Sequence, residues 1–194
     1  MQPTATTIQS IFQENIIWYG LDFSAARFCN FAETPDKLKT GLIPAWNFLI
    51  PNEPAKFNIS SIFRKRNVIF DLGPVAQINA GINETQMLSF NPCSFSNPQE
   101  VIISAVKNYG PGQVASGLGL VFIVESFDKG RQVAAVYITF FDIASKQVIL
   151  AEKVEGRPKG FGLRNYWAGA IFDIMKIVGI NVYNSWINRY ATRG

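Results

Sequence analysis

Two almost continuous apolar runs in the second half of the chain are the features that most constrain its fold. Residues 117–127 and 133–141 lack the polar–apolar alternation of a strand with one solvent-exposed face. Each run therefore predicts a strand that is buried on both sides and needs covering layers above and below the sheet. Polar turns over 128–131 and 142–146, followed by a third strand over 147–154, complete a predicted antiparallel meander.

A helix start lies just before this meander. Asn97 is a predicted N-cap, Pro98 takes the first helical position, and Glu100 completes a capping box. An apolar stripe then continues at helical spacing until Gly110. We therefore predict a helix over 98–109 whose Asn97 side chain accepts a hydrogen bond from a backbone N–H.

Two further segments have helical periodicity. Apolar residues over 163–178 recur at the spacing of one helix face, which predicts a helix packed against the sheet. Over 35–50 the same spacing is interrupted by Gly41 and Pro44. Because proline removes a backbone donor and clashes with the preceding turn, this segment predicts a kinked or two-piece helix.

The first half of the chain adds two predicted strands. Residues 16–23 and 68–72 are short, β-branched or aromatic segments, whereas 75–96 predict a long irregular segment with room for one short helix. The order β-α-β-α-β-β-β-α favours the α/β class with α+β features: a three-layer domain with a mixed sheet. We expect a flexible lead-in over 1–15 and a single domain over 16–194.

Composition excludes several classes of protein and site. The chain has no histidine, which removes Ser-His-Asp triads, histidine metal sites and histidine proton switches. Its only cysteines, Cys29 and Cys93, are too few for a four-thiolate metal site, and they could be free thiols or one disulfide. No apolar run reaches the length of a membrane-spanning helix.

Two segments resemble exported bacterial proteins. The strand–turn–strand sequence FDIASKQVIL over 141–150 resembles the hairpin of TolB amino-terminal-like and FlgO-like envelope domains, with the resemblance extending over about 98–178. The sequence GFGLRNYW over 160–167 is similar to part of an uncharacterised family of exported proteins. These resemblances imply a periplasmic or cell-surface location and no known activity. The first ten residues lack the features of an export signal, so a cytoplasmic location remains the alternative.

The positive charge is concentrated at the end of the chain. Residues 1–150 carry equal numbers of basic and acidic side chains, so the net charge of +4 lies in 151–194. A glycine-containing loop there precedes a helix N-terminus, and backbone N–H groups and cations at such a position can bind an anion. The candidate anion-binding residues are Arg157, Lys159, Gly160, Gly162, Arg164 and Asn165. The alternative is an ordinary surface turn in which Arg164 forms a salt bridge to Glu152 or Glu155, which we favour.

Asp22 and Asp71 form a second candidate pair. Each follows a predicted strand, and ligands of open α/β sheets bind beyond the carboxyl ends of the strands. The two carboxylates could hold a metal for hydrolysis, but acids at strand ends more commonly cap turns or pair with cations.

The sequence therefore favours a non-enzymatic, exported accessory or interaction domain. We expect no cofactor, no catalytic residues and no metal site. The expected partner is an envelope protein or a second copy of the chain, with neither nucleic acid nor a membrane span. A binder of small anions at the Gly156–Arg164 loop is the second hypothesis, and a hydrolase using Asp22 and Asp71 is the third.

Overall fold

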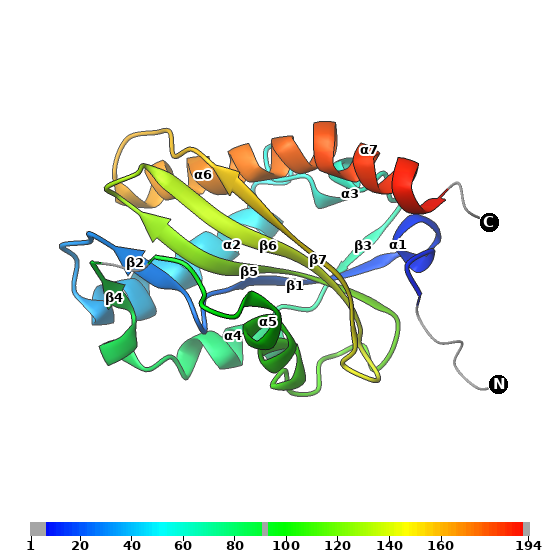
Figure 1. Cartoon of the computed structure of the whole chain (residues 1–194), viewed down its shortest axis with the longest axis horizontal. Coiled ribbons are helices and arrows are strands. Elements are labelled where there is room, and N and C mark those ends of the chain that lie inside the picture. The colour runs from blue at the N-terminus through cyan, green and yellow to red at the C-terminus, as the bar shows by residue number, and fades with distance from the viewer. Residues whose placement is uncertain (1–6, 91–92, 192–194) are drawn as a thin grey trace.

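A seven-stranded mixed sheet forms the centre of the computed structural model, which describes residues 7–90 and 93–191 (Figure 1). The strands are β1 (Ile16–Asp22), β2 (Arg27–Cys29), β3 (Val68–Phe70), β4 (Leu88–Ser89), β5 (Leu118–Asp128), β6 (Val133–Asp142) and β7 (Val148–Gly156). The α-helices are α1 (Ser10–Gln13), α2 (Ile43–Asn52), α3 (Ile59–Ile62), α4 (Gly73–Ala80), α5 (Pro98–Lys107), α6 (Leu163–Ile177) and α7 (Tyr183–Trp186). Shorter or wider turns form η1 (Lys37–Leu42), η2 (Glu84–Gln86), η3 (Val178–Val182) and η4 (Ile187–Ala191).

Strand β5 organises the sheet. On one side it pairs with β6 in antiparallel fashion, and β6 pairs with β7 in the same way. On its other side β5 pairs in parallel with β1 over its first part and with β2 over its last part. Strands β3 and β4 then pair in parallel with β1 and β2 respectively. The position next to β5 is therefore shared by β1 and β2, and the edge of the sheet beyond them is shared by β3 and β4.

The apolar runs behave as their sequences predict. Every residue of β5 is buried, and β6 is buried up to Phe141. Both strands have a neighbour on each side. The predominantly parallel sheet with helices on both faces confirms the α/β class.

Two apolar layers attach the helices to the sheet. One layer joins the sheet to α2, α6 and α7, and it contains four fully buried tryptophans: Trp18, Trp46, Trp167 and Trp186. The other layer joins the opposite face to α4 and α5. In Figure 1 the α6–α7 segment lies on one side of the sheet, and α4 and α5 lie on the other.

The predicted helices occur close to their expected bounds. In α5 the side chain of Asn97 accepts a hydrogen bond from the Glu100 N–H, which confirms the predicted cap. Helix α6 over Leu163–Ile177 buries Trp167 and Ile174 among other residues of its apolar stripe. The interrupted segment is a two-piece helix, with π-helical η1 running directly into α2.

The structure differs from the sequence analysis at three places in the first half of the chain. Part of the expected lead-in over 1–15 is folded, since α1 places the fully buried Ile11 in the core, while residues 1–6 lie outside the described residues. The segment 75–96 contains α4, η2 and β4 in addition to loops. Strands β2 and β4 were not predicted, because strands of two or three residues depend on distant partners rather than on local sequence.

Candidate functional site

The edge of the sheet has a gap between β3 and β4. Strand β3 pairs with β1 only as far as Trp18, and β4 begins opposite Phe28 of β2. Within the described chain, no strand pairs with the end of β1 on this side. The backbone groups that point outward there need other partners, because unpaired buried backbone groups are costly.

Two asparagines supply these partners from opposite faces of the sheet. Asn47 of α2 accepts a hydrogen bond from the Leu21 N–H at 2.7 Å and donates one to the Leu21 carbonyl at 2.9 Å. Asn79 of α4 accepts from the Phe23 N–H at 2.8 Å and also donates to the Leu21 carbonyl at 2.9 Å. The two amides therefore continue the hydrogen-bond ladder where the edge strand is missing.

Gly20 makes this arrangement possible. Its φ of +110° is a conformation that side-chain-bearing residues rarely adopt. A Cβ at this position would also lie 2.5 Å from Oδ1 of Asn47. Glycine thus allows the α2 amide to approach the end of β1 closely.

A pocket of about 380 Å³ opens at this gap, with one wall from η1 and α2 and the other from α4. This volume is within the range of sites for small molecules. Most of the lining is apolar, and both asparagines contribute to it. The lining residues are Lys39, Thr40, Ile43, Pro44, Asn47, Phe48, Leu72, Ala76, Asn79 and Ala80.

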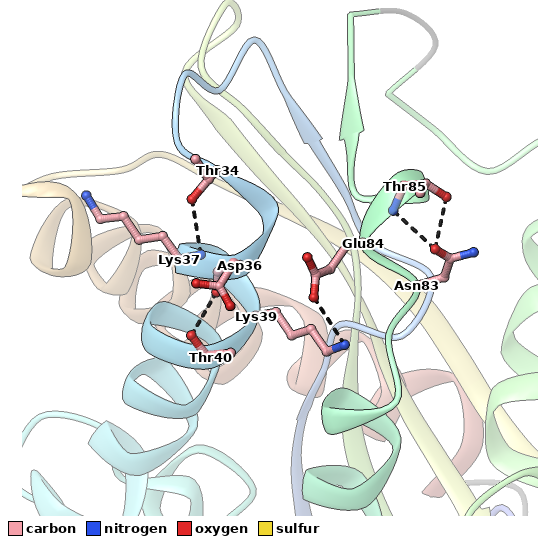
Figure 2. Close-up of polar contacts among 8 residues, drawn as sticks. All are labelled: Thr34, Asp36, Lys37, Lys39, Thr40, Asn83, Glu84 and Thr85. Atoms are coloured by element: carbon pink, nitrogen blue, oxygen red, sulfur yellow. Dashed lines mark hydrogen bonds and ion pairs between the residues drawn. The ribbon is translucent and has the colours of Figure 1, made fainter.

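The polar groups at the η1 side of the pocket are drawn in Figure 2. The Lys39 side chain extends from η1 to η2, where its Nζ lies 3.4 Å from Oε1 of Glu84. The Thr40 hydroxyl donates to the Asp36 carbonyl at 2.9 Å within its own helical turn. Asn83 accepts hydrogen bonds from the N–H and hydroxyl of Thr85 and so caps η2. The Lys39–Glu84 ion pair is therefore the link between η1 and η2 in this view.

The predicted pair Asp22 and Asp71 accepts hydrogen bonds from other parts of the protein. Both side chains are buried. Asp22 accepts hydrogen bonds from the Tyr109 hydroxyl and the Ser24 N–H. Asp71 accepts from the N–H groups of Gln113 and Val114. In the part of the chain that the structure describes, no group of three or more His, Cys, Asp or Glu side chains could hold a metal ion. The aspartates anchor the loops around α5 instead.

Two tyrosines border these carboxylates. Burial raises the pKa of Tyr19 to about 12, and the negative charge of Asp71 is the second, smaller cause. Burial also raises the pKa of Tyr109 well above its ordinary value, and the charge and hydrogen bond of Asp22 are smaller causes of the same shift. The neutral Tyr109 phenol donates its hydrogen bond to Asp22, whereas the buried Tyr19 hydroxyl has no hydrogen-bond partner among the described residues.

The predicted anion-binding loop lies between β7 and α6, on the face of the sheet that α2 also covers, and the Arg164 carbonyl accepts a hydrogen bond from the Trp46 indole of α2 at 2.9 Å. The Arg157 N–H donates to Asp173 and the Lys159 N–H donates to the Tyr166 carbonyl, so two of its backbone donors are occupied. Gly160 and Gly162 both have positive φ. Among the described residues, the Arg164 guanidinium donates one hydrogen bond, of 3.4 Å, to the side-chain oxygen of the adjacent Asn165. The pocket described above includes none of these residues.

The favoured salt bridge of Arg164 is wrong. Glu152 pairs with Arg189 at 3.0 Å, and Glu155 pairs with Arg131 at 3.5 Å and with Lys153 at 3.9 Å. These partners come from the turn between β5 and β6, from β7 and from η4, which hold Arg131, Lys153 and Arg189 respectively.

Sequence reasoning missed the pocket. Its walls come from 39–48 and 72–80, which are separated in the sequence and meet only because of the sheet topology. One local signal was available: Asn47 and Asn79 each stand among apolar residues of a helix, and an amide in such a position needs a specific partner.

Comparisons with protein-family models, with curated proteins and with solved structures return no match for this chain. The resemblances to exported bacterial families therefore stay predictions. Among the helices of residues 7–90 and 93–191, none is long and apolar enough to cross a membrane.

Proposed function

We propose that this chain is a non-enzymatic binding domain that holds a small, largely apolar molecule in the pocket between α2 and α4. The observation that carries the proposal is that the side-chain amides of both lining asparagines are hydrogen-bonded to the protein backbone. Asn47 and Asn79 direct their hydrogen bonds to β1, so the polar atoms of the floor are already paired and the accessible walls are mainly apolar. Apolar pockets with a few fixed polar groups are typical of small-molecule sites.

The proposed location is the periplasm or the cell surface, with the cytoplasm as the alternative. The disulfide between Cys29 and Cys93 supports it, because disulfides persist mainly in oxidising compartments. Mass spectrometry of alkylated protein, isolated from its native cells without reductant, tests this proposal. Two free thiols would contradict it.

A second candidate function is contact with an envelope protein or with a second copy of the chain. It is favoured by Phe161, whose side chain is 95% exposed between two glycines in the basic loop before α6. Exposed aromatic side chains are common contact residues at interfaces. Phe161→Ser should abolish crosslinking to such a partner, whereas Phe48→Ser, at the rim of the pocket, should leave it intact.

Ligand binding to the pocket can be tested by filling it. Ala76 is exposed on the α4 wall, so Ala76→Phe should occupy the space without disturbing the core. Gln77→Phe is the matched control, because Gln77 is exposed on the same helix but does not line the pocket.

The measurement is a thermal-shift and NMR screen of small apolar compounds. A ligand present at about 100 times its Kd should add about 2.7 kcal/mol to the free energy of unfolding. We expect amide shifts to concentrate in α2 and α4, and Ala76→Phe but not Gln77→Phe to remove them. A screen in which no compound perturbs these helices would overturn the proposed function.

A further inference from the structure

The charge distribution around the pocket is asymmetric. Lys39 is the only charged residue among those that line it, all of which lie in the described part of the chain. The other polar lining groups are Thr40 and the two asparagines, whose hydrogen bonds go to backbone groups of Asp36, Leu21, Phe23 and Ile43. A ligand entering the pocket therefore meets one cation and otherwise mainly apolar walls.

The present partner of Lys39 is weakly held. The Nζ–Oε1 distance to Glu84 is 3.4 Å, and the Glu84 side chain is 43% exposed. The Lys39 side chain is 21% exposed, so both partners keep some contact with solvent, and ion pairs at such partly exposed positions contribute little to stability. Glu84 is not a lining residue. Another carboxylate could consequently replace it at small cost.

We propose that the pocket binds an amphipathic monocarboxylate, with its apolar tail between α2 and α4 and its carboxylate paired with Lys39 in place of Glu84. This inference rests on the proposed function of the pocket and adds the class of its ligand. The positive charge of Lys39 favours a carboxylate head group, and the apolar walls favour an apolar tail. A charge-assisted hydrogen bond beside apolar surface is stronger than a neutral one, so the head group contributes to affinity as well as to orientation.

The test compares ligands that share a tail. Octanoate, octanol and octylamine form one set, and phenylacetate, phenylethanol and phenylethylamine form another. Affinities are measured by isothermal titration calorimetry at low salt, and binding is located by amide shifts in the NMR spectrum. We expect each carboxylate to bind about tenfold more tightly than its alcohol. We expect added salt to reduce this preference, because exposed charges are screened, while leaving alcohol binding almost unchanged.

Variants separate charge from structure. Lys39→Met should remove the preference for carboxylates and leave alcohol binding intact, whereas Lys39→Arg should keep the preference. Lys37→Met is the matched control, because Lys37 belongs to the same helical turn but extends away from Glu84. Glu84→Gln removes the competing carboxylate, so it should strengthen carboxylate binding about threefold without affecting the alcohols.

The outcomes distinguish the two proposals. Equal binding of carboxylate and alcohol, tighter binding of the amine, or a preference that survives Lys39→Met would overturn the monocarboxylate proposal while leaving an apolar binding pocket. Absence of binding by every member of both sets would overturn the monocarboxylate proposal, and the broader compound screen would then decide whether the pocket binds any ligand.

Discussion

The Tyr109 hydroxyl donates a hydrogen bond of 2.6 Å to Oδ2 of Asp22, and both residues are buried. Tyr109→Phe removes this donor but keeps the ring that packs against Tyr19 and Phe141. Because the Asp22 carboxylate loses a partner inside the protein, we expect the free energy of unfolding to fall by about 1–3 kcal/mol. Urea denaturation measures the change. Tyr190→Phe is the control, since Tyr190 is only partly buried and should tolerate the loss of its hydroxyl.

The elevated tyrosine pKa values predict sensitivity to alkali. The pKa of Tyr19 is about 12 in the folded protein, and those of Tyr109, Tyr137 and Tyr183 are also raised, mainly by burial. An unfolded tyrosine titrates near pH 10, so these phenols are neutral in both states below that pH. As pH rises further, the unfolded chain releases protons that the folded protein retains, and stability should decline.

The amino group of Lys65 acts in the opposite direction at lower pH. Burial lowers its pKa to about 8 in the folded protein, so its contribution to stability rises between pH 8 and the ordinary lysine pKa. The decline should therefore be measured above pH 10, by urea denaturation at successive pH values. Tyr19→Phe should reduce its slope, and an unchanged slope would contradict the assignment.

The paired amides at the sheet edge predict non-additive mutations. Asn79→Ala leaves the Phe23 N–H without its partner, and Asn47→Ala leaves the Leu21 N–H without its partner. Each single variant should lose about 1–3 kcal/mol of stability. The Leu21 carbonyl keeps one amide donor in each single variant and loses both in the double variant. The double variant should thus lose more than the sum of the singles.

Urea denaturation of the four proteins forms the double-mutant cycle that measures this coupling. Asn165→Ala, at an exposed asparagine in the first turn of α6, is the control and should change stability by less than about 0.5 kcal/mol. Strict additivity of the Asn47 and Asn79 variants would show that the two amides act independently.

The disulfide predicts a defined response to reduction. It links β2 to the segment after β4 across 64 residues of sequence. Cross-links over loops of this size typically stabilise proteins by about 2–4 kcal/mol, so replacing both cysteines by alanine should lower the free energy of unfolding by that amount. A phosphine reductant should destabilise the wild type similarly and leave the double variant unaffected. Equal stability of reduced and oxidised wild type would contradict this prediction.

Elements with strong local signals were predictable from the sequence. The capping box of α5 and the long apolar runs of β5 and β6 determine structure within a few residues, so their bounds lie close to those expected. Strands β2 and β4 are held by pairing with β5 and with each other rather than by their own composition. Local propensity contains no information about such partners.

The candidate site was less predictable than the fold. Glycines and basic residues before α6 match the pattern of an anion site, which stays a prediction, and the N–H groups of Arg157 and Lys159 have partners within the protein. The pocket between α2 and α4 depends on a missing edge strand, which is a property of the whole topology. Sequence pattern identifies residue types that can bind a ligand, whereas the fold decides whether their atoms remain available.

The divided edge of the sheet also bears on whether another chain can add a strand to it. A long, regular edge strand exposes a row of hydrogen-bonding groups on which another chain can assemble. Here the edge consists of β3 and β4, three and two residues long, with the asparagine amides occupying the backbone groups between them. A second sheet would find no continuous template at this edge. The interruption that creates the pocket therefore also protects this edge of the sheet, whereas the opposite edge is β7, which is nine residues long and, within the described chain, pairs only with β6.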